Sequence, residues 1–184
     1  YGGQGMAYFL FSDILGDHKL QIGTEMVVDL QRSDYFFLYR LLPYKIDWNF
    51  AFYHLAYQYS LNPYYNSDSY LYQNIGSFIG ASRPISRFTR IDAGLDFNHI
   101  IKSRISTLFN DYNQPYDEKI SHINSFSTLI PSIKYIWDNA LWSYTHPVEG
   151  LRYYMKYRTS PGINEKSLKF HSATIDVRKY HRLF

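Results

Sequence analysis

The chain lacks cysteine, long hydrophobic runs and blocks of like charge. Without cysteine it has no disulfide framework and no thiolate metal site. No stretch approaches the roughly 18 consecutive apolar residues that identify a transmembrane helix. The net charge of +3 is spread over 184 residues, so no basic block indicates a nucleic-acid partner and no acidic run indicates a solvated tail.

Sequence signatures of catalysis and cofactor binding are also missing. The seven histidines form no His-x-His or His-x-x-x-His pair, which would suit metal ligation. There is no Gly-x-Ser-x-Gly elbow and no phosphate-binding glycine loop. Gly2-Gly3-Gln4-Gly5 precedes an expected strand rather than a helix, so it does not form a helix N-terminal anion site. The sequence therefore predicts no cofactor and no metal.

Aromatic residues, by contrast, are abundant. Twenty tyrosines, thirteen phenylalanines and three tryptophans make up 20% of the chain. Aromatic side chains favour β-strands, and they gather at both lipid–water boundaries of membrane β-barrels. This composition favours an all-β protein and makes a membrane barrel a hypothesis to test.

Polar and apolar side chains alternate along several segments. In Lys19–Leu30 most even-numbered residues are apolar and most odd-numbered residues are polar, so the two sets point to opposite sides of a strand. A tilted transmembrane strand needs roughly 9–11 residues, whereas soluble strands usually have about five or six. Thr89–Asn98 and Leu151–Arg158 repeat the alternation. The charged side of Thr89–Asn98 must meet water, because no soluble core accepts it.

The whole chain, residues 1–184, is interpreted as one all-β domain, an antiparallel transmembrane β-barrel meander of about ten strands. A polar loop is expected at Asn110–Lys119, and a bulge or an unpaired position at Pro131, which cannot donate to a ladder. The apolar side chains of Lys45–Tyr59 change phase at Phe52-Tyr53, which indicates a bulge there or a face that changes neighbours outside the bilayer. A soluble antiparallel β-sandwich or closed barrel is the competing interpretation. The expected strands are Met6–Ile14, Lys19–Leu30, Tyr35–Leu42, Lys45–Tyr59, Tyr70–Ala81, Thr89–Asn98, Ile101–Phe109, Asn124–Trp137, Leu151–Arg158 and Ser167–Tyr180.

Several short stretches together resemble the bacterial surface-antigen family of outer-membrane β-barrels. The matching pieces are Phe11-Ser12-Asp13-Ile14-Leu15-Gly16-Asp17-His18, Arg83-Pro84-Ile85-Ser86-Arg87-Phe88-Thr89-Arg90, Trp137-Asp138-Asn139, Pro147-Val148-Glu149-Gly150-Leu151-Arg152-Tyr153 and Asp176-Val177-Arg178-Lys179-Tyr180. This superfamily holds outer-membrane assembly factors and two-partner secretion translocators, and the resembled branch is often fused to a TolB-like β-propeller. The resemblance implies a sixteen-stranded barrel, of which this chain would be the N-terminal part. The family's Arg-Gly-Phe loop tip does not occur here.

Three groups of residues are candidates for a functional role. A lumen-facing charge lattice is expected because a charge on lipid would cost about 2–4 kcal/mol at the bilayer midplane. Gly150 would relieve crowding at a strand start, while Arg152 pairs with an inward carboxylate. The lattice comprises Arg90, Asp92, Asp96, Lys134, Arg152, Lys156, Arg158, Asp176 and Arg178; a possible lateral-seam strand contains Gly2, Gly3, Gly5, Ser12 and Asp13; interface aromatics are Trp48, Trp137 and Trp142.

The first functional hypothesis is a non-enzymatic outer-membrane barrel that inserts or exports proteins or anchors a periplasmic partner. Its contacts would be outer-membrane lipid and periplasmic or outer-membrane proteins, with no nucleic acid. The second hypothesis is a passive or substrate-selective pore. The third is an outer-membrane protease or lipid hydrolase with a rim site among Asp111, His122, Asp138 and His146, whose spacing specifies no pairing.

Overall fold

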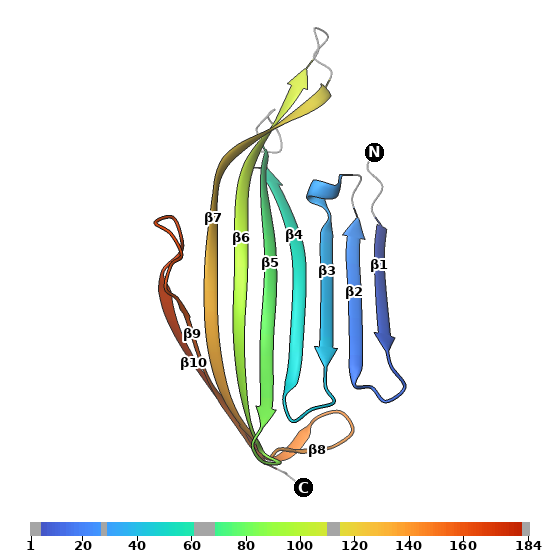
Figure 1. Cartoon of the computed structure of the whole chain (residues 1–184), viewed down its shortest axis with the longest axis vertical. Coiled ribbons are helices and arrows are strands. Elements are labelled where there is room, and N and C mark those ends of the chain that lie inside the picture. The colour runs from blue at the N-terminus through green and yellow to red at the C-terminus, as the bar shows by residue number, and fades with distance from the viewer. Residues whose placement is uncertain (1–4, 27–28, 61–68, 110–114, 182–184) are drawn as a thin grey trace.

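The computed structural model describes residues 5–26, 29–60, 69–109 and 115–181 and is all-β in this part of the chain (Figure 1). One antiparallel sheet contains ten strands, and a single turn of 3-10 helix, η1 (Leu30–Arg32), lies between the second and third. The strands are β1 (Gly5–Ser12), β2 (His18–Met26), β3 (Asp34–Leu41), β4 (Asp47–Ser60), β5 (Ser69–Pro84), β6 (Thr89–Phe109), β7 (Pro115–Asp138), β8 (Leu141–Trp142), β9 (Pro147–Ser160) and β10 (Phe170–Tyr180).

The sheet is a meander in which neighbours in the sequence are neighbours in space. Its order is β1-β2-β3-β4-β5-β6-β7-β9-β10, and the short β8 pairs with β9 outside this path. Strands β9 and β10 are paired yet nearly overlap in Figure 1, whereas β1 to β5 lie side by side, so the sheet curves. The predicted all-β antiparallel meander is confirmed. The sheet itself is open, with β1 and β10 as its two edges, and is not closed into a barrel.

The strand register aligns the alternating side chains into two continuous faces. Phe9, Ile22, Phe37 and Phe52 lie opposite one another in successive strands, and Leu95, Pro131 and their neighbours continue this face. We call it the apolar face and the opposite side the polar face. Besides those residues, the apolar face includes Phe11, Leu20, Tyr39, Phe50, Ile79, Phe97, Leu129, Ile133, Tyr135, Met155, Tyr157, Ile175 and Val177.

The second strand ends earlier than its sequence pattern indicates. The predicted strand Lys19–Leu30 is wrong at its end, because β2 stops at Met26 and Leu30 begins η1. Asp29 caps this turn, since its side chain accepts a hydrogen bond from the backbone N–H of Gln31 at 2.8 Å. An Asp side chain that binds the backbone two residues on competes with strand pairing, so Leu30 belongs to the turn and not to the strand.

The central hairpin is longer than predicted. Thr89–Asn98 and Ile101–Phe109 form one continuous strand, β6, and the predicted loop Asn110–Lys119 is wrong from Pro115 onward, where β7 begins. The ladder between β6 and β7 is shifted between Lys102 and Ser103 and again near Phe109. The hairpin therefore extends past its neighbours and bends across the top of the sheet (Figure 1).

The bulge predicted at Phe52-Tyr53 is wrong, because β4 keeps an unbroken register with both β3 and β5. The apparent change of phase arises because Tyr53 lies on the polar face. Its hydroxyl donates to Asp96 at 3.0 Å and to Asn98 at 2.8 Å. An aromatic residue with a polar tip suits either environment, so hydrophobicity alone misplaces it.

Pro131 does not shift the register between β6 and β7. Its effect is on the side of β7 that faces β9. The ladder between β7 and β9 begins only at Ser132, directly after the proline, as expected for a residue without an N–H. Hydroxyl groups connect the strands beyond this point. Ser160 lies 2.7 Å from the Thr128 hydroxyl, and Ser167 donates to the carbonyl of Ser127 at 2.6 Å. The predicted unpaired position is confirmed, without a bulge.

Within the described ranges, no helix has the length and apolar character needed to cross a membrane.

Candidate functional site

The two faces of the sheet show the reverse of the exposure expected in a soluble protein. Phe52, Ile133 and Ile175 of the apolar face are 53%, 54% and 70% exposed. On the polar face Asp92 and Asp96 are half-buried and Asn98 is only 8% exposed. Soluble monomers rarely expose a continuous apolar patch above several hundred Å². The apolar face is therefore the surface that requires a non-aqueous neighbour.

This apolar face forms a band with defined ends. Along β7 it runs from Leu129 to Trp137, a length close to the roughly 9–11 residues of a tilted transmembrane strand. Toward the loops at the upper end of Figure 1, polar side chains alternate across the strands with Ile75 and Ile101. The polar residues are His54, Gln73, His99, Ser125 and Ser127, which follow the same alternation.

The three predicted interface aromatics lie at the opposite end, beside the turns. Trp48 is stacked on Phe50 with ring centroids 6.3 Å apart, and Trp137 is stacked on Tyr153 at 5.5 Å. Trp142 belongs to β8, which lies at the same lower end of the sheet (Figure 1), and is 60% exposed. Aromatic side chains thus border the band where the turns begin.

All nine predicted lattice residues lie on the polar face. The register pairs Asp92 with Lys134 and Lys134 with Lys156, so one row of charges crosses β6, β7 and β9. A second row runs from Arg152 to Arg178. The other members, Arg90, Asp96, Arg158 and Asp176, alternate in phase with these residues along their own strands.

Three arginines of this face hold carboxylates. Arg90 pairs with Asp92 at 2.8 Å, and Arg178 binds Asp176 through two nitrogens, at 2.9 and 2.8 Å. Arg152 lies 3.4 Å from a carboxylate oxygen of Asp138. Three other cations, Lys134, Lys156 and Arg158, form no ion pair within 4.0 Å among the described residues. The polar face between β7 and β9 therefore carries excess positive charge.

Gly150 is tightly enclosed at the start of β9. Its φ of 115° lies in the region that side chains disfavour. A Cβ here would also lie 2.7 Å from the carbonyl oxygen of Asn139. The Asn139 side chain accepts the N–H of Leu151 at 2.7 Å, so the glycine allows the β7–β9 connection to close against the strand.

Glycines without side chains make room for aromatic rings on the polar face. A Cβ at Gly76 would overlap the ring of Tyr53. The Phe78 ring lies 2.7 Å from the Cβ position of Gly80 and 2.8 Å from that of Gly94. These pairs were not predicted. The sequence pattern that could indicate them is Gly76-x-Phe78-x-Gly80. Its three named residues point to the same face of the strand, so the Phe78 ring has a glycine on either side along the strand.

A cluster of tyrosines lies on the polar face beyond the apolar band. Tyr59 stacks on Tyr70 and Tyr72, with centroids 5.5 and 5.7 Å away, and the ammonium of Lys102 lies 4.9 Å from the Tyr70 ring centre. A hydrogen bond from Lys102 lowers the pKa of the Tyr72 phenol below its ordinary value. The same contact raises the pKa of Lys102. This end of the face thus combines phenol groups with one cation.

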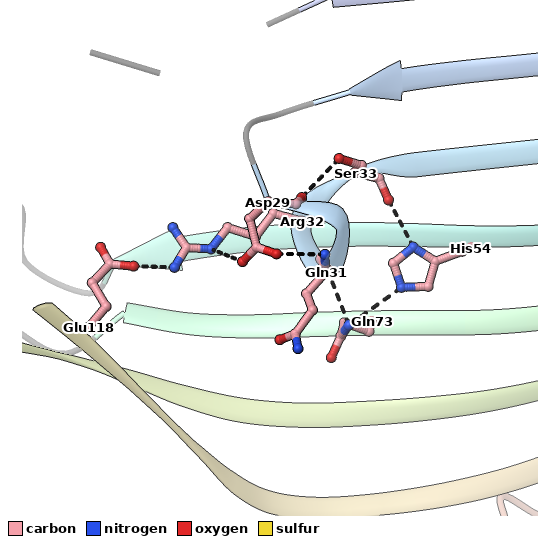
Figure 2. Close-up of polar contacts among 7 residues, drawn as sticks. All are labelled: Asp29, Gln31, Arg32, Ser33, His54, Gln73 and Glu118. Carbon is pink, nitrogen blue, oxygen red and sulfur yellow. Dashed lines mark hydrogen bonds and ion pairs between the residues drawn. The ribbon is translucent and has the colours of Figure 1, made fainter. Parts of the chain in front are cut away.

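A polar network fixes η1 against the upper end of the sheet (Figure 2). Ser33, which is fully buried, accepts a 2.8 Å hydrogen bond from His54 at its carbonyl and donates from its hydroxyl to Asp29. Gln73 donates to the carbonyl of Gln31 at 3.1 Å. Arg32 bridges Asp29 and Glu118 of β7, so the tip of the long hairpin is tied to the β2–β3 connection.

The predicted seam residues that the structure describes lie in or next to β1, at one edge of the sheet. Gly5 begins β1 and Ser12 ends it, while Gly2 and Gly3 lie outside the described residues. Asp13 closes the following turn, because its carboxylate accepts the N–H of His18 at 2.9 Å. The outer side of β1 has no paired strand in the described part of the chain.

The rim residues considered for hydrolysis are dispersed. Asp111 lies outside the described residues. His122 lies on the upper part of β7, whereas Asp138 ends that strand at the opposite end of the sheet, and His146 follows β8. Asp138 is bound to Arg152 and to the N–H of Ala140. The described residues contain no group of three or more His, Asp or Glu side chains placed to hold a metal.

No family model, curated protein or solved structure matches the chain.

Proposed function

We propose that this chain forms part of the wall of a bacterial outer-membrane β-barrel, with the apolar face on lipid and the polar face toward a water-filled interior. The observation that carries the proposal is the inverted exposure of the two faces. Phe52 and Ile133 are exposed while Asn98 is almost covered. Membrane barrels alternate apolar-out and polar-in along each strand, and lipid supplies the non-aqueous neighbour that the apolar face requires.

The ends of the sheet support the same orientation. The turns after β1, β3 and β5 have four or five residues, and Trp48 and Trp137 lie beside them. Outer-membrane barrels have short periplasmic turns, longer extracellular loops and aromatic girdles at the lipid boundaries. The tryptophan end would accordingly face the periplasm, and η1 with the long β6–β7 hairpin would face outward.

The open edges support a barrel that further strands complete. Neighbours on the path are all antiparallel, and the path holds nine strands, so β1 and β10 run in the same direction. Direct pairing of the two edges would be parallel. An antiparallel closure requires an odd number of additional strands, which a sixteen-stranded barrel would provide.

Together with the resemblance to the surface-antigen family, this arrangement supports a non-enzymatic role in protein insertion, protein export or anchoring of a periplasmic partner. β1 would border the lateral seam. A passive or substrate-selective pore is the second candidate, and the observation that favours it is the excess positive charge of Lys134, Lys156 and Arg158 on the polar face.

The lipid orientation can be tested with single cysteines, because the chain contains none. The whole protein is inserted into lipid vesicles after Ile133→Cys or Ile130→Cys, two positions on opposite faces of β7, and labelled with a fluorophore. A quencher attached to lipid tails should dim the label at position 133, and aqueous iodide should dim the label at position 130. Equal quenching at both positions by either reagent would contradict the proposal.

Conductance distinguishes the two candidate roles. The whole protein in planar bilayers should show a small or intermittent conductance if the interior serves assembly or export. A large, steady, anion-selective conductance would contradict the role in assembly or export and support the pore.

A further inference from the structure

We infer that the polar face contains a binding site for a phosphate-type oxyanion between β5, β6, β7 and β9. A recess of about 200 Å³ is lined there by Asn49, Ser82, Asp92, Ser132, Lys134 and Lys156. The site goes beyond the barrel proposal and rests on it only in taking the polar face to be open to water.

Two lysines lie directly opposite each other in the register of β7 and β9. Lys134 and Lys156 are register partners on neighbouring strands, and like charges placed directly opposite each other destabilise a sheet. Asp92 lines the same recess, but its carboxylate is already held by Arg90 at 2.8 Å. Neither lysine has an ion pair among the described residues. The Lys134 ammonium lies over the Tyr154 ring, 4.2 Å from its centre, and an anion would supply the counter-charge that both lysines lack.

Neutral hydrogen-bond donors also line the recess. The Phe78 ring fills the gaps left by Gly80 and Gly94 and forms part of the lining of the recess. The hydroxyls of Ser82 and Ser132 and the amide of Asn49 can donate hydrogen bonds to anion oxygens. Arg158 lies directly opposite Ser132 and adds a third cation nearby. Two ammonium groups with hydroxyl and amide donors suit a compact, multiply charged oxyanion.

The test measures binding of inorganic phosphate to the whole protein folded in detergent micelles, by calorimetric titration at constant ionic strength. We expect saturable binding. Lys156→Gln should weaken it about tenfold, because a charge-assisted hydrogen bond is lost, and Lys156→Arg should retain it. Lys102→Gln is the matched control, since it removes one charge from the same face outside the recess, and it should change affinity less than twofold.

Thermal unfolding gives a second measurement. Phosphate should raise the melting temperature of the unchanged protein, because a ligand bound only to the folded state stabilises it. In phosphate-free buffer Lys156→Gln should melt higher than the unchanged protein, since the like-charge pair is gone, and a given phosphate concentration should raise its melting temperature less. The higher melting temperature also establishes that the variant folds.

The site would be disproved by undetectable phosphate binding to the unchanged protein, or by equal weakening in Lys156→Gln and Lys102→Gln. Glycerol 3-phosphate is titrated in parallel. Tighter binding than inorganic phosphate would assign the site to a phosphate monoester, and weaker binding would assign it to the free ion. Both assays take place in micelles, so their failure is distinct from failure of the lipid-quenching experiment.

Discussion

Strand β1 and the last four strands on the sheet path share one face and differ on the other. Phe9 on β1 and Ile133 on β7 both lie on the apolar face and are both about half exposed, at 52% and 54%. On the opposite face, β6 to β10 carry arginines, lysines and aspartates in cross-strand rows. The corresponding face of β1 carries Met6, Tyr8 and Leu10.

The apolar face therefore needs the same environment in every strand, whereas the environment that the opposite face needs differs between β1 and β6 to β10. A common apolar face indicates one environment along its full width, as lipid would provide. The charged face of β6 to β10 needs water and counter-charges. The apolar second face of β1 lacks the inward charges with which natural proteins protect edge strands, which distinguishes β1 from the other edge, β10, with its Asp176–Arg178 pair.

The largest expected effect is the difference in stability loss between lysine substitutions on the two faces of β7. Ile133→Lys should lower the free energy of unfolding by about 2–4 kcal/mol in lipid, the cost of a lysine near the bilayer midplane. Ile130→Lys is the matched change, because Ile130 lies directly opposite Asp96 on the polar face, and it should cost less than about 1 kcal/mol. Urea unfolding in vesicles measures both. Equal costs would remove the distinction between the faces.

The next effect concerns the joint between the two regions, where β4 and β5 meet. Gly76→Ala should destabilise the protein by about 1–3 kcal/mol, because the new methyl group displaces the Tyr53 ring and disturbs its hydrogen bonds to Asp96 and Asn98. Gly5→Ala is the control, since no atom lies within 4 Å of its Cβ position. Equal unfolding midpoints for the two variants would show that the ring does not need this gap.

A smaller effect sharpens the contrast at β1. Phe9→Lys should cost about 2 kcal/mol in lipid, whereas Leu10→Lys, on the other face of the same strand, should cost less than about 1 kcal/mol if that face meets water. The same vesicle unfolding assay applies. A cost for Leu10→Lys as large as that for Phe9→Lys would show that apolar material covers both faces of β1.

The smallest effect is expected at the opposite edge. Asp176→Asn breaks the ion pair with Arg178, whose side chain is 58% exposed, and exposed ion pairs contribute little to stability. Thermal unfolding at low and high salt should show a small loss that salt reduces. A loss as large as that expected for Gly76→Ala would mean that this edge is shielded from water in the folded protein.

The sequence was sufficient for the parts of the fold that depend on simple alternation. Thr89–Asn98 and the charged residues of β9 and β10 lie in the predicted phase, because the side-chain period of a strand is two wherever its register is regular. The unpaired side of Pro131 followed from the missing N–H. These features depend on single residues or on one strand.

Features that depend on two or more strands were missed. The phase of Tyr53 predicts a bulge, because nothing in its own strand reveals Gly76 beside it. The end of β2 was misplaced because Asp29 forms a turn whose network includes His54 and Gln73. The recess between Lys134 and Lys156 requires the β7–β9 register, which periodicity within one strand does not specify.

The meander order has a consequence for how the chain assembles. Each strand on the path pairs with the strand that precedes it on the path, and only β8 interrupts the sequence order. Every pairing therefore closes a short loop, whose entropic cost is small, and low sequence separation of contacts favours rapid folding. The sheet can grow hairpin by hairpin from any starting pair, without waiting for distant segments to meet.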